Sequence, residues 1–211
     1  MRSFKVLIRE LRGFLILWLT QSFSALGSAM TNFALIVWSY QAQGSALTTA
    51  LLSVCSYAPY VVMSIFAGAL SDRWNKKAVM LASDSFAALC TVAVLVLLQA
   101  GRLEIWHLYC LNALNGLMNT VQQPAADVAI SLLTPERHYG LRSLANSLIN
   151  MLTPMFATAL LALAGIHAVI LFDLFTFFAA FLSLLFLVKL PAAPSGAARA
   201  ESVLRCARQG L

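Results

Sequence analysis

The sequence predicts an all-α, polytopic membrane protein with six transmembrane helices. Its 211 residues are 61% hydrophobic and only 10% charged, with a mean hydropathy of +0.83, whereas a soluble domain carries about 25% charged residues. Such a chain has too few charges to cover a water-facing surface, so we expect lipid around most of it. Two further observations support this class: six long apolar segments, and a one-sided distribution of basic residues between them.

Each apolar segment is long enough to cross a bilayer, which takes about 20 mostly apolar residues. The connections are short, so consecutive helices are expected to be antiparallel neighbours. Only Gly165 and Ile166 separate the last two segments. The six predicted spans are about Phe14–Trp38, Thr48–Leu70, Ala78–Leu98, Ile105–Ile130, Leu141–Ala164 and His167–Val188.

The two ends of the chain need separate interpretation. The first apolar segment follows basic residues, as in a signal peptide, but it exceeds the roughly 7–15 apolar residues of such a peptide. We therefore expect it to be retained as a helix. Residues 191–211 begin with a segment rich in Pro, Ala, Ser and Gly and are too polar to span. They are expected to form a cytoplasmic linker or tail, at which one half of a larger protein stops.

Basic residues predict the orientation, because Lys and Arg are enriched in cytoplasmic loops. With six spans and both termini inside, thirteen of the 14 basic residues fall on the cytoplasmic side, and only Arg102 falls outside. The net charge of +6 is then explained by topology, without a nucleic-acid partner. The expected location is the plasma (inner) membrane, with membrane lipid as the surrounding partner.

Neither an enzyme nor a metal protein is indicated. The three histidines, His107, His138 and His167, lie at or near predicted membrane interfaces, and no two share a helix face. The four cysteines have no zinc or disulfide spacing, and no Gly-rich phosphate loop is present. We expect no catalytic residues, no metal and no cofactor.

Polar side chains recur at helical spacing in the first, fourth and fifth spans. Polar residues in the hydrocarbon region usually face a bundle interior or a water-filled cavity, although such residues also join helices without binding a ligand. Both readings stay open for the first and fifth spans, whereas the amide-rich fourth span favours a cavity. The candidate cavity-lining residues are Gln21, Ser24, Ser28, Asn32, Asn112, Asn115, Asn119, Gln122 and Asn150.

Three acidic residues lie within the predicted spans. Asp84 and Asp127 are near cytoplasmic basic residues in the sequence, so structural ion pairs are expected for both. Asp173 has no basic residue near it in the sequence. A carboxyl that exchanges protons needs burial without a permanent cationic partner, which makes Asp173 the candidate proton carrier.

The loop between the second and third spans carries the most specific motif, Gly68-Ala-Leu-Ser-Asp-Arg-Trp-Asn-Lys-Lys77. It resembles the loop signature of the major facilitator superfamily, Gly-x-x-x-Asp-Arg/Lys-x-Gly-Arg/Lys-Arg/Lys. Asn75 replaces the usual Gly, and because Asn tolerates a left-handed backbone we expect the tight turn to be kept. The residues that match the signature are Gly68, Asp72, Arg73, Lys76 and Lys77.

The resemblance extends over roughly residues 10–190, where the chain is similar to macrolide-efflux-type drug exporters. The matching stretches include residues 14–21, 101–108 and 172–177. The family implies efflux of small amphipathic solutes by alternating access, driven by protons. Two departures put the usual proton route in doubt: Asn112 stands where many proton-coupled members have Arg, and the surroundings of Pro154 lack the Gly-rich pattern of antiporters.

Length is the larger departure, since such transporters have two six-span halves with the site between them. The resemblance therefore implies the amino-terminal half of a major-facilitator-type fold. A small-molecule solute and a second six-span half, or a second copy in a homodimer, are the expected partners. The alternative is a non-transporting membrane fragment or an interaction partner that needs such a half.

Overall fold

The computed structural model describes residues 4–71, 75–133 and 139–187, and this part of the chain is helical throughout with short connections. Its elements are five α-helices followed by a short π-helical turn. In chain order they are α1 (Phe4–Gln43), α2 (Ala46–Ser71), α3 (Lys76–Gln99), α4 (Ile105–Leu133), α5 (Tyr139–Leu182) and η2 (Ser183–Leu187).

Helix α5 consists of two helical halves that meet at Gly165. This residue has φ 78° and ψ 177°, a backbone conformation that is accessible essentially to glycine alone. The break falls in the interval between the fifth and sixth predicted spans. The second half of α5 runs antiparallel to α1, since Ser28 contacts Asp173 while the earlier Thr20 contacts the later Ser183.

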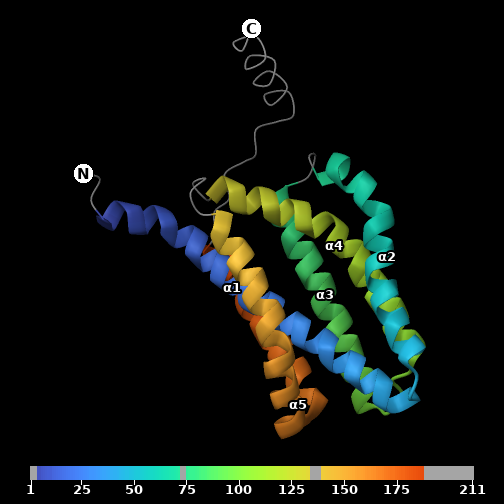
Figure 1. Ribbon diagram of the computed structural model, residues 1–211. Coiled ribbons are helices and arrows are strands. Elements are labelled where there is room, and N and C mark those ends of the chain that lie inside the picture. The colour runs from blue at the N-terminus through green and yellow to red at the C-terminus, as the bar shows by residue number, and fades with distance from the viewer. Residues whose placement is uncertain (1–3, 72–74, 134–138, 188–211) are drawn as a thin grey trace.

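The helices pack mainly as two pairs, α1 with α5 and α2 with α4, while α3 contacts α4 and α5 (Figure 1). A glycine permits the close approach in each pair. A Cβ at Gly27 would lie 3.0 Å from the Cα of Asp173, and a Cβ at Gly116 would lie 3.1 Å from the carbonyl carbon of Ser56. Both distances are shorter than ordinary carbon–carbon contact, about 3.5–4.0 Å.

Large apolar side chains cover much of the described surface. Leu163 is 86% exposed and Phe186 72% exposed, an arrangement that water would not favour and lipid would. The buried apolar residues form separate small clusters, one around Leu17, Met80 and Leu184 and another around Leu35, Leu108 and Ile170. The apolar side chains are thus distributed between thin interhelical seams and the outside, as expected for a membrane protein.

Three segments of the described residues are long and apolar enough to cross a membrane, rather than the six predicted: Ala46–Met63, Lys76–Gln99 and Asn146–Leu187. The third has 42 residues and includes both halves of α5, so it is long enough for two crossings. Helices α1 and α4 are not among these three segments, which were sought only where the side chains are described.

Candidate functional site

A cavity of about 780 Å³ with both polar and apolar walls lies between the helices and is lined by residues of all five α-helices. The first and fourth helices supply most of its polar residues. Eight of the predicted cavity residues lie on its wall: Gln21, Ser24, Ser28, Asn32, Asn112, Asn115, Asn119 and Gln122.

The ninth predicted residue, Asn150, is exposed and does not line the cavity. Helix α5 instead contributes Asn146 and Ile149 from its first half. In this half of α5 the lining residues therefore include Asn146 but not Asn150, which lies one helical turn further along the chain.

Hydrogen bonding distinguishes the two asparagines at the α2–α4 seam. Asn112 accepts a hydrogen bond from Ser56 Oγ at 3.0 Å and donates one to the Leu108 carbonyl at 2.9 Å. Its amide therefore joins helices. Asn115 Oδ1 is buried and has no hydrogen-bond partner within the described residues. A buried acceptor without a partner is costly, which makes Asn115 the better candidate for contact with a bound solute.

Asp84 is 8% exposed and lies at the junction of three helices. Its two carboxyl oxygens accept hydrogen bonds from separate amides, Gln21 Nε2 on α1 at 3.4 Å and Gln122 Nε2 on α4. The expected ion pair is therefore wrong for the described part of the chain: Lys76 and Lys77 lie at the start of α3, about two turns before Asp84, whereas the two amides face the carboxyl across the bundle. The side chain of Asp127 lies outside the described residues.

Asp173 is 4% exposed and lies where the second half of α5 crosses α1. Ser28 Oγ donates a hydrogen bond to its Oδ1 at 2.9 Å, and Thr176 Oγ1 donates to its backbone carbonyl, also at 2.9 Å. Asp84 and Asp173 are the only charged residues among those that line the cavity within the described chain, and no Lys, Arg or His accompanies them there.

Aromatic residues of the wall were not among the predicted site residues. Trp18, Tyr57, Tyr60 and Phe177 line the cavity with the amides, and together they give it both apolar and polar faces. Such a mixture is typical of small-molecule sites, which are about 300–1,000 Å³ in volume. Because aromatic residues are common throughout the apolar segments, sequence spacing alone does not single these out.

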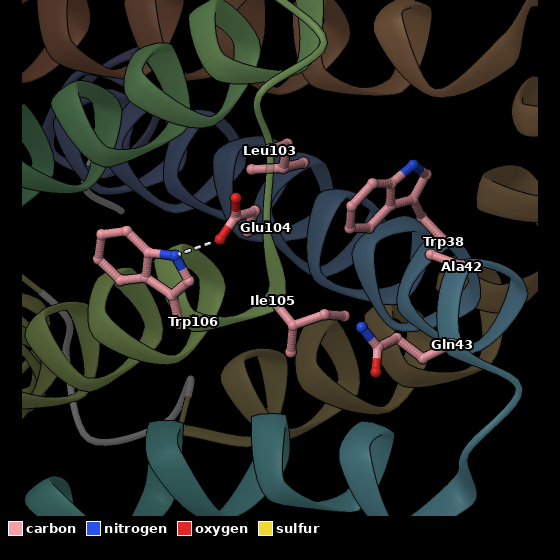
Figure 2. A pocket seen from close by; sticks show the side chains of 7 residues that line it. All are labelled: Trp38, Ala42, Gln43, Leu103, Glu104, Ile105 and Trp106. Carbon is pink, nitrogen blue, oxygen red and sulfur yellow. Dashed lines mark hydrogen bonds between the residues drawn. The ribbon is translucent and has the colours of Figure 1, made fainter.

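A second, smaller cavity of about 370 Å³ lies at the end of the bundle where α1 ends and α4 begins. Figure 2 shows Glu104 between the rings of Trp38 and Trp106, with the Trp106 indole donating to Glu104 Oε2 at 2.6 Å. His107 Nδ1 accepts from the Glu104 backbone N–H at 3.2 Å. These contacts brace the start of α4.

The loop motif is described in part. Gly68 lies within α2, Asp72 and Arg73 lie outside the described residues, and Lys76 is buried. Lys77 Nζ donates a hydrogen bond to the Leu185 carbonyl at 3.0 Å, which ties the start of α3 to the π-helical turn after α5. The cation thus interacts with a carbonyl of the last helical turn, where positive charge is favourable.

Asn75 does not adopt the left-handed backbone expected for it. It has φ −65° and ψ 115°, and its Oδ1 accepts hydrogen bonds from the backbone N–H groups of Lys77 and Ala78 at 3.0 and 3.4 Å. Asn75 is therefore the N-cap of α3. Asn75 thus contributes through its side chain, which caps α3, and not through a left-handed turn. Asn is among the residues preferred at the N-cap.

Comparison with known proteins gives two findings. Residues 17–208 match the Major Facilitator Superfamily. The chain is also 27% identical over 170 residues to the uncharacterized MFS-type transporter YfiS of Bacillus subtilis (strain 168). That alignment covers 78% of the chain but only 40% of the relative.

Proposed function

Because the chain belongs to the major facilitator superfamily, we propose that it is a transmembrane transporter, or one half of one, that exports small amphipathic solutes by alternating access. The observation that carries this proposal is the 780 Å³ cavity with its amides, aromatic rings and buried Asn115 acceptor. A solute that donates a hydrogen bond to Asn115 would satisfy that oxygen, while the aromatic faces would hold its apolar part.

Six membrane crossings fit the fold, although hydropathy alone supports three candidate segments. Helices α1 and α4 carry many of the polar residues of the cavity wall, which fits membrane helices that border a water-filled space. The charge distribution supports both termini inside and a location in the plasma (inner) membrane. Residues 191–211 are proposed as the cytoplasmic linker.

A second half is part of the proposal. The chain spans 40% of the length of its relative, and transporters of this superfamily bind substrate between two six-span halves. Without a partner, the cavity amides would face lipid, where each unsatisfied polar group costs several kcal/mol. We therefore propose pairing with a separate half or with a second copy of this chain. The non-transporting fragment remains the alternative, and it predicts a stable but inactive monomer.

Coupling to an ion is proposed at Asp173, the candidate proton carrier. Its support is its burial, its place on the cavity wall and the lack of a cationic partner there among the described residues.

The test is efflux of a fluorescent amphipathic amine from cells that express the chain alone or with a candidate second half. Asn115→Leu is expected to reduce efflux at least about tenfold, since one lost hydrogen bond of about 1.4 kcal/mol corresponds to tenfold in binding. Asn150→Leu, an exposed amide outside the cavity, is the matched control. Mass measurement in lipid nanodiscs reports the oligomeric state. A stable monomer that exports nothing in either setting would refute the transport proposal.

A further inference from the structure

The crossing of α1, α3 and the second half of α5 brings together several oxygen-bearing side chains around Asp173. Ser28 Oγ lies 2.9 Å from Asp173 Oδ1, and Thr31 on α1 and Thr91 on α3 line the same cavity as this carboxyl. Thr176, 6% exposed, binds the Asp173 backbone carbonyl one turn back along α5. The side chains of this cluster offer one carboxylate and hydroxyls from two neighbouring helices as ligand atoms.

Thr31 gives this cluster a feature that helix packing does not explain. Its side chain is 5% exposed and lines the cavity, yet its Oγ1 has no hydrogen-bond partner of normal geometry within the described residues. Buried hydroxyls in folded proteins are nearly always paired. A hydroxyl beside a carboxylate that leaves its oxygen unpaired is suited to coordinate a cation, because that oxygen has two lone pairs.

The charge of Asp173 also favours a bound cation. The Asp173 carboxylate is buried, and no Lys, Arg or His lies on the described cavity wall to balance it. A buried, unpaired charge is expensive, and a small cation from solution would remove that cost. Oxygen-only ligands select hard cations. A divalent ion is less suitable, because Ca²⁺ takes 6–8 oxygen ligands, usually with several carboxylates, and Mg²⁺ keeps most of its waters.

We propose that Asp173, Ser28, Thr31 and Thr91 form a binding site for a monovalent metal cation, Na⁺, on the wall of the cavity. The Asp173 carboxylate supplies the charge and the three hydroxyls supply neutral oxygen ligands. Gly27 contributes by its missing side chain, since a Cβ there would lie 3.2 Å from Asp173 Oδ1 and closer still to Thr176 Oγ1. Any larger residue at position 27 would displace the carboxyl or one of its neighbours.

The proposed ligands lie on α1, α3 and the part of α5 that follows Gly165. The site holds α1 and α3 against the second half of α5, and the same cavity is bordered by the first half. Binding of Na⁺ would therefore stabilise one arrangement of these helices. Its role as the coupling ion rests on the proposed transport function, whereas binding itself does not.

The test uses the full chain in lipid nanodiscs at one pH and one ionic strength, with NaCl replaced by KCl or choline chloride. Bound ²²Na⁺ is measured by equilibrium dialysis, and thermal unfolding is followed in parallel. We expect saturable ²²Na⁺ binding and a rise of the unfolding temperature in Na⁺ that K⁺ and choline do not reproduce. D173N is expected to abolish binding, and T31V to weaken it about tenfold, the scale found for single groups around metal sites.

Thr158→Val is the matched control for T31V, because Thr158 is an exposed hydroxyl on α5 away from the cavity. Asp84→Asn is the control for D173N, since it removes the other cavity carboxylate. If D173N fails to fold, the comparison of T31V with T158V still decides the question. No Na⁺-specific binding by the folded wild-type chain, or equal binding by T31V and T158V, would overturn the proposal. A response to pH without any response to Na⁺ would also overturn it and would favour a proton at Asp173.

The experiments distinguish a failure of the transport proposal from a failure of the proposed Na⁺ site. Na⁺ binding without efflux refutes transport and leaves the site, while efflux that is unchanged when Na⁺ is removed refutes the coupling role.

Discussion

Replacement of Gly116 by alanine tests the close seam between α2 and α4. The added Cβ would lie 3.1 Å from the carbonyl carbon of Ser56 and closer still to its oxygen. No rotamer change relieves a clash with backbone, so the helices must separate by about 0.5–1 Å to restore normal contact. Overpacking of this kind costs about 1–3 kcal/mol, and the hydrogen bond from Ser56 to Asn112 would stretch as well.

Thermal unfolding in a mild detergent measures this cost. For a chain of this size, 1 kcal/mol corresponds to about 2–4 °C, so a loss of about 2 kcal/mol lowers the midpoint by about 4–8 °C. Ala162→Val, which adds carbon atoms at an exposed position of α5, is the control and should change the midpoint by less than about 1 °C. Equal midpoints for Gly116→Ala and the wild type would show that the α2–α4 seam is looser than described here.

Three further predictions concern the cap, the buried carboxyl and the topology. Asn75→Ala removes the cap of α3 and should lower the free energy of unfolding by about 1 kcal/mol, whereas Asn75→Asp should not; equal losses would argue against capping. Gln122→Leu and Asp84→Leu should each destabilise by about 1–3 kcal/mol, and a double-mutant cycle should give a coupling energy of at least about 0.5 kcal/mol; strict additivity would refute the contact. Cysteine labelling from outside should reach variants at Gln43, Arg102 and Ile166 but not at Asn75, Arg137 and Ser195, and a protected Arg102 position would refute the six-span topology.

The sequence was most informative where polar residues interrupt apolar segments. The amides of α4 predicted a cavity wall, and Asn112, Asn115, Asn119 and Gln122 all lie on one cavity. Periodicity is informative here because the polar face of a membrane helix usually turns toward the bundle interior or a water-filled cavity. It could not separate Asn112, which joins helices, from Asn115, which has an unpaired oxygen, because that difference depends on the position of Ser56 on another helix.

Neighbours in the sequence were a poorer guide to neighbours in space. Basic residues near Asp84 in the sequence suggested an ion pair, but the carboxyl faces inward to Gln21 and Gln122 from helices 63 and 38 residues away along the chain. The left-handed turn predicted at Asn75 is likewise wrong, because its backbone is extended and its side chain caps α3. Both errors arise from contacts that only packing defines.

The reversal at Gly165 has a consequence for biosynthesis. One residue at φ 78° and ψ 177° joins two long apolar helices, so no hydrophilic segment lies between them to be translocated on its own. The two helices would then insert into the bilayer together as a hairpin. The first helix could not complete its insertion before the second helix had been synthesised. An inserted tag or a bulkier residue at this point would act during synthesis, before any folded protein exists.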